Sequence, residues 1–202
     1  MTSPPPDTAA IADLARAARA CTLCAPHLPL GPRPILQAPP APRVLIVSQA
    51  PGTRAHASGI PWHDASGDRL RDWFGVDRTR FYDSGAFAIL PMGFCYPGRG
   101  RGGDLPPRPE CAPRWHPAFL RHYAEVPLVL LIGQYAQARY LGARRKPTLA
   151  LTVQSAAEYG PRYLPLPHPS PRNGIWLRRN PWFETDVLPE LRRRVAQACA
   201  AP

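Results

Sequence analysis

Continuous apolar runs of strand length constrain the fold of this chain more than any other feature. Three of them are "RVLIVS" at 43–48, "AFAIL" at 86–90 and "PLVLLIG" at 127–133, and a weaker one, "RYLPL", follows at 162–166. A run that does not alternate between apolar and polar residues is typical of a strand covered on both faces, as in parallel sheets. The chain therefore needs helices on both sides of a short sheet.

Helical periodicity fills the intervals between these runs. It predicts helices from Asp7 or Thr8 to about 20, over about 67–74, over 112–123 and over 134–141. A last helix, capped at Asn180, places one apolar face toward the core: Val187, Leu188, Leu191, Val195 and Ala198. Strand–helix alternation predicts a single α/β domain over 1–202, with residues 1–7 flexible. Its architecture is a three-layer αβα sandwich around a central, mostly parallel four-stranded sheet.

The excess of positive charge indicates which kind of partner the protein could bind. The chain carries 25 Lys and Arg against 14 Asp and Glu, a net charge of +11, and only one of the cations is a lysine, Lys146. Such an excess is typical of proteins that bind DNA or RNA, although a basic surface without a partner fits it equally well. No apolar run reaches the length of about 18 residues that a membrane span requires.

The N-terminus, "MTSPPPDTAA", has neither the basic segment nor the apolar segment of a signal peptide. We therefore expect the protein in the cytoplasm. In that compartment the five cysteines are expected to be free thiols or metal ligands.

Each predicted strand is followed by a polar or Gly/Pro-rich loop. These loops are "SQAPG" at 48–52, "PMGFCYPG" at 91–98, "GQYA" at 133–136 and "PHPSPRN" at 167–173. Ligands of open parallel sheets bind at the carboxyl ends of the strands, where all four loops would meet. The sequence therefore predicts one site at this edge, with the proline-stiffened loop around His168 as one wall.

A second polar segment, "GIPWHDASG" at 59–67, brings Trp62, His63 and Asp64 together. An aromatic ring beside a carboxylate could stack on a nucleobase and act on its sugar. On these residues alone, Trp62 could equally be a core residue and Asp64 a helix cap. His63 could enter the pocket or lie exposed.

The order of these motifs, "APG" after a strand, then "GIPWHDASG" and finally "HPSPRN", resembles the uracil-DNA glycosylase superfamily. The resemblance runs from about Cys21 to Val195 and is strongest to its iron–sulfur bacterial and archaeal branches, called families four and five. It implies removal of uracil from DNA after base flipping. It also implies catalytic roles for two residues: Asp64 would act near the sugar, and His168 would donate to the departing base.

The resemblance also implies a set of binding residues. Those that would meet the flipped nucleotide are Ser48, Gln49, Ala50, Pro51, Gly52, Trp62, His63, Gln134 and Ser170. Arg99, Arg101 and Arg172 would meet DNA phosphates. Gln49 and Ala50 occupy positions where other branches have carboxylates, and Pro91 occupies the position of a base-reading asparagine.

The cysteines form a second constellation. Cys21 and Cys24 are a close pair, and Cys95 and Cys111 flank a basic Pro/Gly-rich loop. Four thiolates suit an iron–sulfur cluster or zinc, and the resemblance implies a 4Fe-4S cluster. A site left empty is a further possibility. Cys199, in the last predicted helix, is expected to be an ordinary packing residue.

Three functions remain open from the sequence. The first is a monomeric, monofunctional uracil-DNA glycosylase, because no lysine near the motifs could form a Schiff base. The second is a glycosylase that also accepts hypoxanthine or xanthine. The third is a catalytically silent DNA-binding member, which Gln49 and Ala50 favour and Asp64 and His168 oppose.

Overall fold

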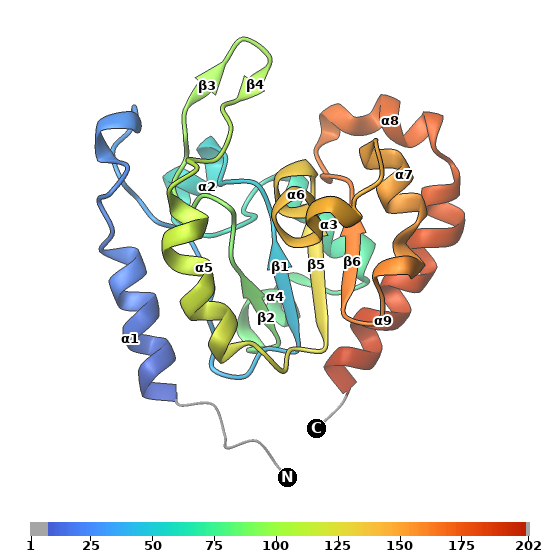
Figure 1. Cartoon of the computed structure of the whole chain (residues 1–202), viewed down its shortest axis with the longest axis horizontal. Coiled ribbons are helices and arrows are strands. Elements are labelled where there is room, and N and C mark those ends of the chain that lie inside the picture. Colours follow the sequence, from blue (N-terminus) through green and yellow to red (C-terminus); the bar gives the residue numbers. More distant parts are fainter. Residues whose placement is uncertain (1–7, 201–202) are drawn as a thin grey trace.

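The fold is built on one four-stranded sheet, seen in a computed structural model that describes residues 8–200 (Figure 1). The strands are β1 (Val44–Val47), β2 (Phe87–Ile89), β5 (Leu128–Ile132) and β6 (Tyr163–Leu166). They pair in the order β2-β1-β5-β6, and every pairing is parallel. The predicted fold class is confirmed. The lead-in at 1–7, predicted to be flexible, lies outside the described residues.

Helices connect the strands. They are α1 (Thr8–Arg19), α2 (Thr53–Ser58), α3 (Ala65–Phe74), α4 (Arg78–Asp83), α5 (Cys111–His122), α6 (Gln134–Leu141), α7 (Leu149–Gln154), α8 (Gly174–Arg179) and α9 (Leu188–Ala200). Four of the five longest, α1, α3, α5 and α6, correspond to predicted helices within about two residues at each end, whereas α9 begins at Leu188, well after the start predicted at Asn180. The four short ones, of six residues each, are too brief for apolar periodicity to reveal.

Two apolar cores lie on opposite faces of the sheet. Val44 and Ile46 of β1 belong to the core that includes residues of α3 and α9. Their neighbours Leu45 and Val47 point to the other core, formed with α1, α5 and α6. Because successive side chains of a strand point to opposite faces, four consecutive buried residues require covering layers on both sides.

The segment before α9 differs from the prediction. Asn180 does not start the last helix: its side-chain amide donates to the carbonyl of Trp176 at 2.8 Å and so ends α8. A π-helical turn, Phe183–Val187, then leads into α9. The Pro-rich stretch before β1 packs against the domain, since Ile35 is only 2% exposed and Gln37 bridges to the β2 strand at Ile89.

A small hairpin projects beyond the carboxyl ends of the sheet strands. It consists of β3 (Arg99–Gly100) and β4 (Gly103–Asp104), which pair antiparallel. In the view of Figure 1 it stands at the top of the molecule, above α2. Within residues 8–200, no helix combines the length and the apolar character that crossing a membrane would require.

Candidate active site

A cleft with a volume of about 690 Å³ opens at the carboxyl ends of the strands. Loops after all four strands of the sheet line it, as the sequence predicted. They contribute Ser48, Gln49, Ala50, Pro51 and Gly52 after β1, Pro91 after β2, Gly133 and Gln134 after β5, and His168, Ser170 and Arg172 after β6. Trp62 and Asp64 join them from the segment before α3. Residues separated by more than 100 positions in the chain thus share one site.

Asp64 uses its two carboxylate oxygens differently. Its Oδ1 accepts a hydrogen bond from the backbone N–H of Gly67 at 2.9 Å and thereby caps α3. Its Oδ2 faces the first loop and lies 3.8 Å from the point where a Cβ on Gly52 would stand. Asp64 is therefore both the helix cap and a carboxylate of the cleft, and the two interpretations of the sequence do not compete.

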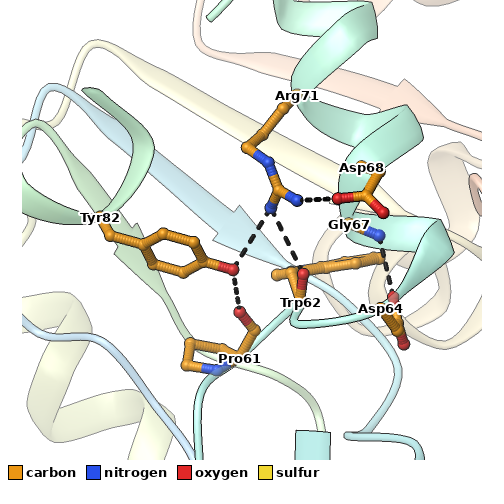
Figure 2. A network of polar contacts seen from close by, with 7 residues as sticks. All are labelled: Pro61, Trp62, Asp64, Gly67, Asp68, Arg71 and Tyr82. Carbon is orange, nitrogen blue, oxygen red and sulfur yellow. Dashed lines mark hydrogen bonds and ion pairs between the residues drawn. The ribbon is translucent and has the colours of Figure 1, made fainter. Parts of the chain in front are cut away.

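A buried arginine holds the turn that carries Asp64 (Figure 2). The Arg71 guanidinium, on a residue that is 5% exposed, donates to the carbonyl of Trp62 and to the hydroxyl of Tyr82, each at 3.3 Å, and pairs with Asp68. The Tyr82 hydroxyl in turn donates to the carbonyl of Pro61 at 2.7 Å. Sequence reasoning missed this network, because an arginine in a helix ordinarily indicates a solvated face.

The Trp62 backbone has the left-handed conformation, with φ 59°, which is uncommon for a residue other than glycine. Trp62 is 9% exposed, packs into the core on the α3 side and lines the cleft. The indole and the His168 imidazole lie face to face at a tilt, with centroids 5.3 Å apart and planes inclined by 31°. The indole thus supports the His168 ring from one side.

The His168 imidazole is uncharged at neutral pH. Burial lowers its pKa to about 4, while the negative charge of Asp64 acts in the opposite direction. Its backbone is fixed as well, since the Asn173 side-chain amide donates to the His168 carbonyl at 2.7 Å. A neutral imidazole can present an N–H to a developing anion without first changing its protonation state.

Hydrogen bonds between loops fix the rest of the cleft wall. The N–H groups of Met92 and Gly93 donate to the carbonyls of Ser48 and Gln49 at 2.8 and 3.0 Å. Behind them, His116 contacts the Pro91 carbonyl through Nε2 at 2.9 Å. The two loops after β1 and β2 are therefore joined by backbone hydrogen bonds.

His116 is itself fully buried and fully partnered. Its Nδ1 lies 2.7 Å from the Tyr140 hydroxyl, and its other ring nitrogen faces Pro91. Because a carbonyl can only accept, Nε2 carries the proton and Nδ1 accepts from Tyr140. Burial lowers the pKa of His116 to about 4.

The predicted DNA-contacting residues separate into two groups. Arg99 and Arg172 line the cleft, and the Arg172 guanidinium packs so close to Gly103 that a Cβ there would stand 2.7 Å from its Nη1. Arg101, at the exposed turn of the hairpin, and His63, exposed beside Asp64, do not line the cleft. Asp104 does line it, and the sequence did not single this residue out.

The four predicted ligand cysteines line a second, much smaller cavity. Cys21, Cys24, Cys95 and Cys111 surround it together with Trp115 and Arg108. The backbone N–H of Phe94 donates to the Cys111 sulfur at 3.3 Å. Burial raises the pKa of Cys95 to about 11 and that of Cys111 to about 12, so both are thiols in the absence of a cation. Over residues 8–200, no three His, Cys, Asp or Glu side chains are arranged to hold a single metal ion.

Comparison with protein families agrees with this geometry. The family model of the uracil DNA glycosylase superfamily matches residues 36–192, which include every strand and every loop of the cleft. The chain belongs to this superfamily. It is accordingly a DNA glycosylase, a DNA repair enzyme that hydrolyses N-glycosyl bonds during base excision repair. The match begins after Cys21 and Cys24, so it leaves out two of the four cysteines of the second cavity.

Proposed function

We propose that this uracil DNA glycosylase superfamily member removes uracil from DNA and leaves an abasic site. The observation that carries the proposal is the pairing of Asp64 and His168 in one cleft, with a free carboxylate oxygen on the first and a neutral imidazole on the second. These are the two groups that hydrolysis of a deoxyuridine needs. We further propose that the enzyme acts as a monomer in the bacterial cytoplasm.

The proposed reaction separates charge between sugar and base. As the C1′–N1 bond breaks, its electron pair leaves with the uracil and the sugar becomes cationic. The free oxygen of Asp64 stabilises that cation and holds the attacking water. The water oxygen bonds to C1′ as one of its protons passes to the Asp64 carboxylate, which returns it to solvent, and the released uracil anion takes up a proton from solvent. The N–H of His168 stabilises the negative charge on the uracil O2, a kind of contact that contributes about 3 kcal/mol to lowering a barrier.

Base recognition in this proposal relies on glutamines. Pro91 offers no side-chain amide, and the carbonyls of Ser48 and Gln49 already accept hydrogen bonds from the adjacent loop. The side chains of Gln49 and Gln134 line the cleft and make no hydrogen bond to the described residues. An amide has both a donor and an acceptor, which match the alternating edge of uracil. Rotation of the amide exchanges the positions of its donor and its acceptor, so the same glutamine can also match the edge of another base. Hypoxanthine and xanthine are therefore the alternative substrates.

A monofunctional reaction fits the position of the single lysine. Lys146 forms an ion pair with Glu158 at 2.6 Å and lies outside the lining of the cleft. A Schiff base with the abasic sugar needs an amine at C1′. We therefore expect hydrolysis without strand cleavage.

The test is single-turnover cleavage of oligonucleotides containing uracil, hypoxanthine or xanthine, with abasic sites revealed by alkali. We expect wild-type protein to release uracil and Asp64→Asn to be slower by at least about 100-fold. Asn retains the cap on α3, so the comparison isolates the charge. Release of only hypoxanthine or xanthine would assign the alternative substrates. Binding in a gel-shift assay without release of any base would indicate the silent DNA-binding member.

We also propose that the cysteine cavity holds a 4Fe-4S cluster, as in the iron–sulfur branches that the sequence resembles. Four cysteines around one cavity, and an N–H donating to one sulfur, support it. Zinc would need all its ligand sulfurs within about 2.3 Å of one centre, whereas a cluster is held around a larger cage. The spacing of the four cysteines along the chain, together with the resemblance, favours the cluster over zinc.

The cluster proposal predicts a brown protein with broad visible absorbance and four irons per chain after anaerobic purification. Cys95→Ser should lose iron and colour, while Cys199→Ser, which alters a cysteine outside the cavity, should keep both. A colourless wild-type protein with one zinc per chain would contradict the cluster and leave the glycosylase proposal in place.

A further inference from the structure

A second carboxylate faces the same loop as Asp64. Asp104 Oδ2 lies 3.5 Å from the point where a Cβ on Gly52 would stand, and Asp64 Oδ2 lies 3.8 Å from that point. The two oxygens come from elements 40 residues apart, the N-terminus of α3 and strand β4 of the hairpin. Gly52 has no side chain between them, so both carboxylates reach the same part of the cleft.

The charge of Asp104 is not neutralised by its basic neighbours. Arg99 is its partner across the hairpin, and Arg172 packs on the adjacent Gly103. Even so, within residues 8–200 the carboxylate of Asp104 makes no ion pair with either arginine. An unpaired negative charge in a cleft that binds a polyanion opposes phosphate binding. It becomes favourable only where the bound DNA develops positive charge.

The phenol of Tyr96 contacts the carboxylate of Asp104. Tyr96 is 3% exposed, and burial raises the pKa of its phenol, as do the charge of Asp104 and a hydrogen bond to that carboxylate. A protonated phenol that donates to one side of a carboxylate leaves the remaining lone pairs directed elsewhere. Asp104 is itself exposed, and the contact with Tyr96 orients its carboxylate.

We infer that Asp104 is a further catalytic carboxylate, which acts with Asp64 to stabilise the cationic sugar as the C1′–N bond breaks. This inference rests on the proposed glycosylase function. It accounts for how a chain with Gln49 and Ala50 in its first loop still places sufficient negative charge beside the sugar. Asp64 uses one of its two oxygens to cap α3. The hairpin supplies the second carboxylate, Asp104.

The experiment compares binding of two uncleavable DNA probes, so it does not depend on which base is released. One probe carries a pyrrolidine in place of the deoxyribose, which is cationic at neutral pH, and the other carries the neutral tetrahydrofuran analogue. Wild-type protein should prefer the cationic probe. Asp104→Asn should lower that preference by about tenfold, because one of two nearby negative charges is removed. Asp104→Glu should restore much of it.

Asp83→Asn is the matched control, because it removes an exposed carboxylate that lies at the end of α4 and outside the cleft. It makes the same change in net charge and should leave the preference at the wild-type value. A preference that is equal in wild type and Asp104→Asn would overturn the inference and leave the proposed function intact. A wild-type protein that shows no preference and also releases no base would overturn both.

Discussion

The Cα of Gly67 lies directly against the backbone carbonyl of Trp62, and a Cβ at position 67 would stand 1.7 Å from that oxygen. The contact occurs where the chain folds back to start α3, and Gly67 is also the residue whose N–H donates to Asp64. The missing side chain lets the helix approach the turn closely enough for that hydrogen bond. Glycine is therefore required here for space, since its φ is not in the left-handed region.

Gly67→Ala should destabilise the protein by about 3 kcal/mol, because the backbone of the turn must move to accept a methyl group. Activity should fall further than stability explains, since the same shift displaces Asp64. Urea unfolding and single-turnover cleavage measure the two effects. Gly174→Ala is the control, as its Cβ would meet only the end of the Arg178 side chain at 3.8 Å. Equal effects of both substitutions would contradict the steric argument.

Tyr82→Phe should cost about 1 to 2 kcal/mol of unfolding free energy, because it leaves the Pro61 carbonyl without its donor. The Arg71 guanidinium would also lose one of its acceptors. Tyr135→Phe removes a hydroxyl that makes no hydrogen bond to the described residues, and serves as the control. Denaturant unfolding of both variants measures the two losses of unfolding free energy. A loss no larger than that of the control would show that water replaces the hydroxyl.

His168→Ala should lower the single-turnover rate by about two orders of magnitude through loss of the donor to the base. Binding to undamaged DNA should change little, because it depends on arginine–phosphate contacts. Loss of ring packing on Trp62 should lower the melting temperature as well, so both are measured on one preparation. A variant that melts earlier yet cleaves at the wild-type rate would leave His168 with a packing role only.

His116 should make the protein less stable as the pH falls from about 6.5 toward 4. The unfolded imidazole takes up a proton below its usual pKa of about 6.5, whereas the buried one resists protonation down to about 4. The unfolded state therefore binds more protons in this window, and each such histidine contributes a slope of up to about 1.4 kcal/mol per pH unit. His116→Gln should reduce the slope of unfolding free energy against pH. An unchanged slope would contradict a neutral buried imidazole.

Arg99→Ala and Arg172→Ala should each weaken DNA binding and make log Kd less dependent on log salt. The slope should fall by about 0.9 for each phosphate that the variant no longer neutralises. Both guanidiniums line the cleft. Arg101→Ala tests whether the exposed turn of the hairpin also reaches a phosphate. Arg16→Ala, on the exposed face of α1 and paired with Asp13, should leave the slope unchanged. A slope that no substitution in the cleft alters would place the phosphate-binding residues elsewhere.

The fold could be predicted from the sequence because four buried strands have an unusually clear pattern. Residues 44–47 are all buried, and such a run has few alternatives to a strand inside a parallel sheet. The short helices could not be predicted, because six residues contain fewer than two turns. The role predicted for Asn180 was wrong because Asn before Pro fits the end of one helix as well as the start of the next.

The candidate site could be predicted in part, because loops after parallel strands converge whatever their sequence. The supporting residues could not. Arg71 resembles a surface arginine until the turn of Trp62 folds over it, and Asp104 lies in a Gly-rich segment that indicates only a loop. Both act through contacts between distant parts of the chain, which periodicity and motif spacing do not encode. The roles predicted for the site residues stay predictions until the variants are measured.

The hydrogen bond from Gly67 to Asp64 Oδ1 has a consequence for the entropy of the reaction. An aspartate on a free loop would lose rotational freedom each time a nucleotide entered the cleft. Here the helix cap has already removed that freedom during folding, so the free oxygen keeps one orientation in the empty protein. The entropy cost of ordering the Asp64 side chain is thus included in the free energy of folding. Little of that cost remains to raise the free energy of the transition state.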